Sequence, residues 1–122
     1  MIQRSGSYRW VGVYDVGPEE IAVIAWTGPA PPTHPRFPVT QGLNGQAVAS
    51  RRTIVVGDVA VHPHYLATLS STRAEIVVPV LGRDGSVVGT IDVESEIVNR
   101  FTEADRALVE KCAEAITPLF KR

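Results

Sequence analysis

Three acidic residues that could bind a cation are predicted to share one end of a β-sheet. Glu75 lies near the start of an apolar stretch, and Asp92 and Glu94 lie near the end of the next one. Paired as an antiparallel hairpin, the two stretches place all three carboxylates on one face, because side chains alternate along a strand. Opposed like charges destabilise a sheet by about 0.2–1 kcal/mol. Partial burial would raise at least one carboxylate pKa unless a cation compensates.

The pairing register follows from a predicted two-residue turn at Asp84–Gly85, since Asp-Gly is the strongest short hairpin signal. If Arg83 pairs with Ser86, the numbers of opposed residues sum to 169, and Glu75 lies opposite Glu94. A solvated strand end is the alternative interpretation of this acidic end. Both faces of the hairpin are apolar, which favours a cover over the carboxylates.

Two aromatic residues are predicted to form a wall beside the acids. Trp10 and Tyr14 lie two positions to either side of Gly12 on the first predicted strand, so they share one face. Aromatic walls with carboxylates at one end suit a ligand that has an ammonium group and a modest apolar tail. We therefore expect a free amino acid or a similar amine to bind there. The predicted ligand-binding set is Trp10, Tyr14, Glu75, Asp92 and Glu94.

The elements that must position these residues alternate strands with a few helices, which indicates an α+β domain. We expect one domain over residues 1–122, with a central antiparallel sheet, helices on one face and a loop-covered ligand pocket on the other. Residues 28–38 hold five of the nine prolines and are predicted to form a surface loop. The predicted strands cover residues 8–15, 21–27, 53–56, 74–81 and 87–95, and a short helix covers residues 43–51.

A last helix is expected to begin after Thr102, which is a good N-cap residue. Its buried stripe is predicted to contain Leu108, Cys112, Ile116 and Leu119. The exposed edge of this helix, with Val109 and residues 119–120, offers more apolar surface than one sheet face needs, so we expect a homodimer that uses the first segment and this helix.

Composition limits the classes of function. The chain has 122 residues, 44% hydrophobic residues and a net charge of −1, which predicts a soluble globular protein with no nucleic-acid partner. No apolar run approaches the roughly 20 residues needed to span a bilayer. Residues 1–10 lack the apolar core of a signal peptide, so we expect a cytoplasmic protein without a membrane partner. The lone Cys112 allows no intrachain disulfide and is interpreted as a core residue.

Other polar groups receive structural interpretations. His62 and His64 fall short of a metal-ligand set, so we expect turn residues and no metal. Residues 70–72 are interpreted as a solvated loop, because no histidine pairs convincingly with them. Residues 51–52 are interpreted as a charge pair at a helix C-terminus, and Trp26 as a core residue.

Four stretches together resemble the GAF family of small-molecule-binding domains, and among them the free methionine-(R)-sulfoxide reductases. They are RWVGVYDV (residues 9–16), FPVTQGLNGQAVASRRTIVVGDVAVHPHY (37–65), AEIVVPVLGRDGSVVGTIDVESE (74–96) and RFTEADRALVEKCAEAI (100–116). The resemblance covers most of the chain and rests on the order and spacing of these stretches.

The resemblance implies cysteine chemistry that this chain lacks. Asn44, His34 and Thr68 fall at or near the positions where those reductases carry cysteines. An amide, an imidazole and a hydroxyl cannot carry out thiol–disulfide exchange. The resemblance also implies that Trp10, Tyr14, Glu75 and Asp92 hold the free amino acid, and that Glu94 stands where an aspartate is expected.

A non-catalytic GAF domain that binds or senses a small amine-bearing metabolite is therefore the leading hypothesis, with no cofactor. A structural or dimerising signalling module with a vestigial pocket is one alternative, and an enzyme with altered chemistry is another. The signature of cyclic-nucleotide-binding GAF domains and the linking cysteine of a bilin site are both missing.

Overall fold

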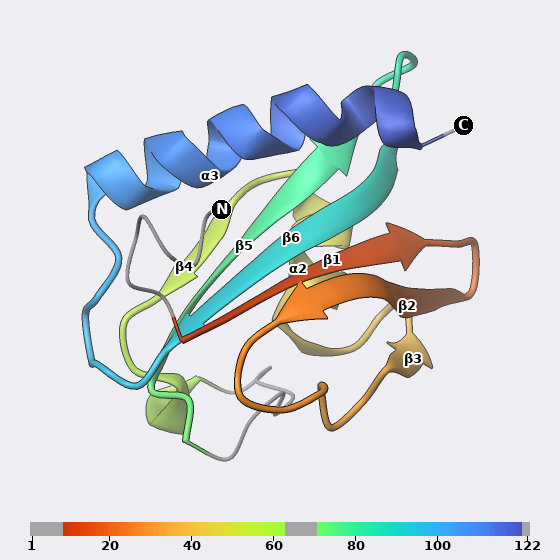
Figure 1. The fold of residues 1–122 in the computed structure, drawn as a ribbon. Coiled ribbons are helices and arrows are strands. Elements are labelled where there is room, and N and C mark those ends of the chain that lie inside the picture. Colours follow the sequence, from red (N-terminus) through yellow and green to blue (C-terminus); the bar gives the residue numbers. More distant parts are fainter. Residues whose placement is uncertain (1–8, 63–70, 121–122) are drawn as a thin grey trace.

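The computed structural model describes residues 9–62 and 71–120, which build a six-stranded antiparallel sheet with helices packed on it (Figure 1). The strand order is β3-β2-β1-β6-β5-β4. The strands are β1 (Trp10–Val16), β2 (Glu20–Thr27), β3 (Arg36–Pro38), β4 (Ile54–Val56), β5 (Ala74–Leu81) and β6 (Val87–Ser95). The helices are α2 (Gly42–Ser50), α3 (Glu103–Ile116) and two single 3-10 turns, η1 (Val59–Val61) and η2 (Thr117–Leu119).

The two central hairpin strands have the predicted bounds and the predicted register. Glu75 pairs with Glu94 and Val77 with Asp92, so the acidic residues lie where the alternation places them. The end of the hairpin differs from the prediction, because the register shifts between Val80 and Leu81.

The turn itself is longer than the predicted two-residue loop. The amide of Gly82 donates to the carbonyl oxygen of Ser86 over 2.8 Å, and the amide of Gly85 donates to the carbonyl oxygen of Gly82 over 3.0 Å. Gly85 adopts a φ of 83°, which glycine tolerates without the steric cost of a side chain. The register shift absorbs the difference in loop length, so the body of the hairpin keeps the expected pairing.

The two helices lie on opposite faces of the sheet, whereas the sequence predicted helices on one face only. α3 covers β5 and β6 over an aliphatic core that includes Ile76, Val78 and Ile91. On the other face, Leu43 and Ala47 of α2 pack with neighbours from β4 and β5. The α+β class and the central antiparallel sheet are confirmed, and the face that carries the acidic residues is the one that α2 covers.

The buried stripe of α3 differs from the predicted one. Val109 and Ala113 are the fully buried residues, with Cys112 and Ile116 partly buried against the same core. Leu119 is 77% exposed, and Leu108 is also exposed. Several small alanines occupy this helix, so its apolar periodicity leaves the rotation about the helix axis ambiguous by one position.

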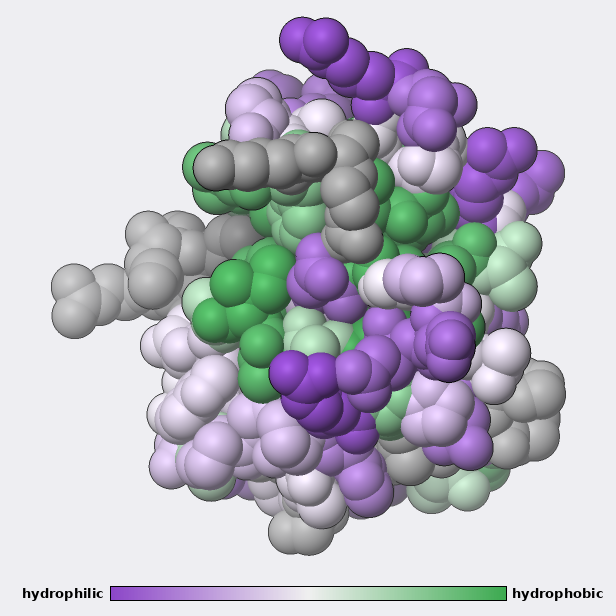
Figure 2. Space-filling view, turned by 90° about the vertical axis from the view of Figure 1, so that its right-hand side faces the viewer, coloured by the Kyte–Doolittle hydropathy of each residue, from purple (hydrophilic) through white to green (hydrophobic). Residues whose placement is uncertain are grey.

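Two further surface features differ from the expectations. Trp26, predicted to lie in the core, is 41% exposed on β2. The proline-rich loop at residues 28–38 ends in the short edge strand β3, a position that tolerates Pro38. At the end of the molecule where α3 finishes, hydrophobic residues are interspersed with hydrophilic ones (Figure 2).

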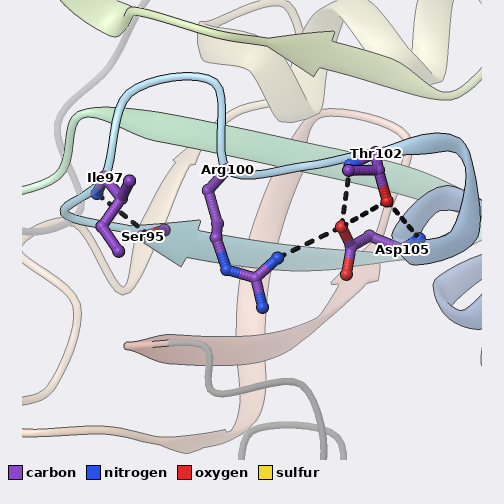
Figure 3. Close-up of polar contacts among 5 residues, drawn as sticks. All are labelled: Ser95, Ile97, Arg100, Thr102 and Asp105. Carbon is purple, nitrogen blue, oxygen red and sulfur yellow. Dashed lines mark hydrogen bonds and ion pairs between the residues drawn. The ribbon is translucent and has the colours of Figure 1, made fainter.

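A polar network fixes the connection from β6 to α3 (Figure 3). The Thr102 side chain accepts from the amide of Asp105, and the Asp105 carboxylate accepts from the amide of Thr102 over 2.7 Å, which is a capping box. Arg100 pairs with the same carboxylate at 3.2 Å, and the Ser95 hydroxyl accepts from the amide of Ile97. The predicted N-cap at Thr102 is confirmed, and the chain leaving β6 is held close to the end that carries Asp92 and Glu94.

Candidate functional site

Glu75, Asp92 and Glu94 come together under α2, each at most 2% exposed. Glu75 lies on β5, and the other two lie on the neighbouring β6. One carboxylate oxygen from each residue lies within 4.8 Å of the others, a spacing that a single cationic group could bridge. The structure thus brings the three sequence-predicted acids to one buried place.

Asn44 orients Asp92 from above the sheet. Its side-chain nitrogen donates to Asp92 Oδ2 over 3.0 Å, and its side-chain oxygen accepts from the hydroxyl of Thr90 over 2.6 Å. The position depends on a tight approach at the start of α2, since a Cβ atom on Gly45 would lie 2.7 Å from the backbone of Thr40. The glycine after Asn44 therefore lets the helix start close to the preceding segment, and the amide is held over β6.

Thr72 gives Glu94 its own hydrogen-bond donor. The hydroxyl of Thr72 lies 2.5 Å from Glu94 Oε1, and Thr72 is 5% exposed. The interpretation of residues 70–72 as a solvated loop is therefore wrong for Thr72, which is buried because it satisfies a buried carboxylate. Ser71 is half-buried and accepts from Arg9 over 3.1 Å, while Ser70 lies outside the described residues.

Trp10 and Tyr14 form a buried aromatic wall on the same face, as predicted. Trp10 on β1 pairs with Glu94 on β6. The ring centroids of Trp10 and Tyr14 lie 6.4 Å apart. The Trp10 ring extends over Gly12, where an added Cβ atom would approach it to 2.1 Å. Since Gly12 pairs with Asp92, the indole lies over the strand position next to the acidic cluster.

The proline-rich loop supports this wall. The indole nitrogen of Trp10 donates to the carbonyl oxygen of Ala30 over 3.0 Å, and the Phe37 ring meets Tyr14 edge-on at 5.7 Å. Phe37 is not among the residues predicted for the site, because its only signal in the sequence is an apolar residue between Arg36 and Pro38 at the end of the loop.

Burial dominates the electrostatics of the acidic cluster. It raises the pKa of Glu75 well above its usual range, and the neighbouring charges of Asp92 and Glu94 raise it further. Burial also raises the pKa of Asp92, while hydrogen bonds from its neighbours, Asn44 among them, oppose this rise. Glu75 Oε1 and Asp92 Oδ1 have no hydrogen-bond partner within the described structure. Both atoms are buried hydrogen-bond acceptors, so a donor group that bound beside them would be stabilised.

The remaining candidates from the sequence lie elsewhere or fall outside the described residues. His34 is half-buried in the proline-rich loop, and His62 follows η1 as its C-cap. Thr68 and His64 lie outside the described residues. Arg51 ends α2 in a left-handed conformation and donates to the carbonyl oxygen of Gly85 over 3.0 Å, so it joins the helix end to the hairpin turn.

The site therefore consists of a buried polar cluster beneath α2, on a six-stranded antiparallel sheet that carries a helix on each face. The family model for the GAF domain matches residues 2–117, and the chain belongs to the GAF family.

Several relatives are similar over most of the chain. The GAF domain-containing protein A of Dictyostelium discoideum is 36% identical over 81% of this chain and 61% of its own length. Protein YtsP of Bacillus subtilis is 30% identical over 88% of this chain and 66% of its own length. This chain therefore spans about two thirds or less of these curated relatives.

Solved structures of free methionine-R-sulfoxide reductases share the fold. The type II enzyme of Thermoplasma acidophilum superposes with a TM-score of 0.91 at 31% identity, covering 98% of this chain and 84% of that one. The Neisseria meningitidis enzyme, solved in complex with its substrate, gives 0.88 at 35% identity, covering 98% and 71%. The predicted resemblance to the GAF family and to these reductases is confirmed. In the described part of the chain, no helix is long and apolar enough to cross a membrane.

We predict that Glu75→Gln stabilises the protein at alkaline pH. Because the pKa of Glu75 is raised in the folded state, the folded protein binds more protons than the unfolded one above the usual glutamate pKa. Stability should therefore fall as pH rises, and a glutamine cannot ionise. At pH 8 the variant should have the higher free energy of unfolding, and the difference from the wild type should be smaller near pH 5.

Denaturant unfolding across this pH range measures the difference. Glu96→Gln is the matched control, because Glu96 is exposed and pairs with Arg9 at the surface. A Glu75→Gln variant that is less stable than the wild type at pH 8 would contradict this account of the cluster.

Proposed function

We propose that this GAF domain binds a small metabolite through its ammonium group, with a free amino acid as the leading class of ligand. The observation that carries the proposal is the burial of three carboxylates beside an aromatic wall. Within the described residues, neither Glu75 nor Asp92 forms an ion pair. A buried negative charge without a cation is costly, so a cationic ligand is the group that this site would stabilise most.

An ammonium group also matches the geometry. It offers three donors, and Glu75, Asp92 and Glu94 offer one nearby oxygen each. Trp10 and Tyr14 would contact a short apolar tail, and an ammonium near an aromatic face gains a further cation–π attraction. Anions and neutral apolar molecules lack the charge that the acids require.

The relatives support a small-molecule ligand. One reductase structure was solved with its substrate, and another similar structure, 31% identical with a TM-score of 0.81, is of a putative GAF sensor protein from Burkholderia vietnamiensis. We infer a binding or sensing role for this chain, in the cytoplasm and without a nucleic-acid or membrane partner, and a single domain over residues 1–122.

We infer that the chain does not reduce methionine sulfoxide. Cys112 is the only cysteine in the sequence, and it packs against the aliphatic core on the α3 face. The acids lie on the other face, so the thiol is separated from them by the sheet. Asn44, where the resemblance implies a cysteine, instead holds Asp92.

Two other functions make different predictions. A structural module with a vestigial pocket would bind no amine. A site for a metal cation would use the same three carboxylate oxygens, which lie close enough together to hold one. An amine and a metal would compete for this place, so the binding experiment separates these alternatives.

We predict that methionine, its sulfoxide or a related amino acid binds with submillimolar affinity, as measured by calorimetry. Glu75→Gln and Asp92→Asn should each weaken binding at least about tenfold, since a charged hydrogen bond contributes about 1.5–3 kcal/mol. Glu96→Gln should leave the affinity unchanged. N-acetylmethionine, which lacks the ammonium group, should not bind.

The same titrations include magnesium, calcium and zinc salts. Binding of a metal with no binding of any amine would show that the site holds a metal cation. No amine binding below millimolar concentration, or binding that ignores both substitutions, would refute the amine site.

Turnover of methionine-(R)-sulfoxide with a thiol reductant is predicted to stay at background. The reason is the lack of a thiol near the acids. Reduction well above a no-protein control that persists in the Cys112→Ser variant would contradict this prediction and favour an enzyme with altered chemistry.

The homodimer remains a prediction with a weaker basis than the sequence suggested. Val109, one of the residues assigned to the exposed edge of the last helix, is buried against the sheet. Leu108 and Leu119 are the exposed large hydrophobic residues on this part of the chain. Light scattering at high micromolar concentration tests the prediction, and a monomer mass would overturn it.

A further inference from the structure

We propose that Glu75 carries a proton in the ligand-free protein, and that the ammonium group of the ligand takes the place of this proton. Binding would then release about one proton for each amine bound. The mechanism rests on the proposed amine site and describes how that site holds three buried acids together before the ligand arrives.

The hydrogen-bond donors of the site single out Glu75. Asp92 accepts from the amide of Asn44, and Glu94 accepts from the hydroxyl of Thr72. Among the described residues, Glu75 receives no such bond from an amide or a hydroxyl, and its Oε1 atom has no partner. Ionised carboxylates only accept hydrogen bonds, so Glu75 is attracted to the other two acids only when it holds a proton.

The orientation of Asn44 favours Asp92 as the neighbour that stays ionised. Thr90 donates its hydroxyl proton to the side-chain oxygen of Asn44, and the amide nitrogen of Asn44 donates to Asp92. Asp92 therefore receives a permanent donor that favours its anionic form. Glu75 is therefore the acid of the cluster that carries the proton.

Among the residues that the structure describes, the other groups around Glu75 do not supply a compensating charge. α2 and β4, which pack beside it, contain no charged residue. Across the sheet, β6 presents Asp92 and Glu94, and β1 presents the uncharged side chain of Trp10 opposite Glu94. In the segment before β5, Arg73 is half-exposed and pairs with Asp58 at 3.7 Å. Burial and the two neighbouring charges accordingly raise the pKa of Glu75.

The exchange makes binding depend on pH with a defined sign. The ligand binds the deprotonated form of Glu75, so affinity should rise with pH until Glu75 is ionised without ligand. While one proton is released and the ligand remains a cation, the gain is about tenfold per pH unit. A neutral analogue would release no proton, so the exchange also selects for ammonium compounds.

Calorimetry of methionine binding in buffers with different ionisation enthalpies counts the protons directly. At neutral pH the wild type and the surface control Glu96→Gln should each release about one proton per methionine. Glu75→Gln should release close to none if it still binds. Methionine binding without proton release would overturn this inference and leave the amine site intact.

Infrared spectroscopy tests the ligand-free state without relying on affinity. The wild type should show the carbonyl stretch of a protonated carboxyl at neutral pH, and Glu75→Gln should lack it. The band should disappear when methionine binds. Absence of the band from the ligand-free wild type would overturn the proposal. If no amine binds, the amine site and the exchange both fail.

Discussion

Burying three carboxylates side by side is the constraint on which the arrangement of this face depends. The sheet register forces Glu75 opposite Glu94, and Asp92 lies one pleat away on the same face. Nothing in a strand pairing relieves the repulsion between them. The neighbouring elements must therefore supply donors, and they do so with an amide from α2 and a hydroxyl from the segment before β5. The start of α2 and the position of Thr72 are consequences of the acids beneath them.

The two faces of the sheet differ in what they bury. Beneath α3, the fully buried cluster is entirely aliphatic. On the face of α2, the aromatic wall and a small cluster around Leu43 and Val77 pack on the same side of the sheet as the acids. Apolar burial on both faces therefore offsets the cost of the acidic cluster.

The sequence predicted the acidic cluster because the side-chain alternation of a strand has only two states. The predicted turn was too short, but the register shift between Val80 and Leu81 restores the expected pairing, so Glu75 and Asp92 lie on the predicted face.

Contacts between distant segments could not be predicted from the sequence. Thr72 donates to Glu94 across 22 positions and Asn44 to Asp92 across 48, and no local pattern marks either pair. The predicted buried stripe of α3 was wrong for a different reason, because its alanines can lie on either the buried or the exposed side of a helix.

On the proposed function, the residue at position 44 would separate binding from redox chemistry within one fold. A thiol there could attack a sulfur atom, but it is a weak hydrogen-bond donor and a weak acceptor. The amide of Asn44 uses both of its ends at once, accepting from Thr90 and donating to Asp92. On the proposed function, this exchange removes a reactive group and adds support to an acid of the binding site. The acids themselves lie on β5 and β6 and do not depend on a thiol for their position. A GAF domain could thus lose reductase chemistry through substitutions in α2 and the loops while its sheet still presents the charges that an amine requires.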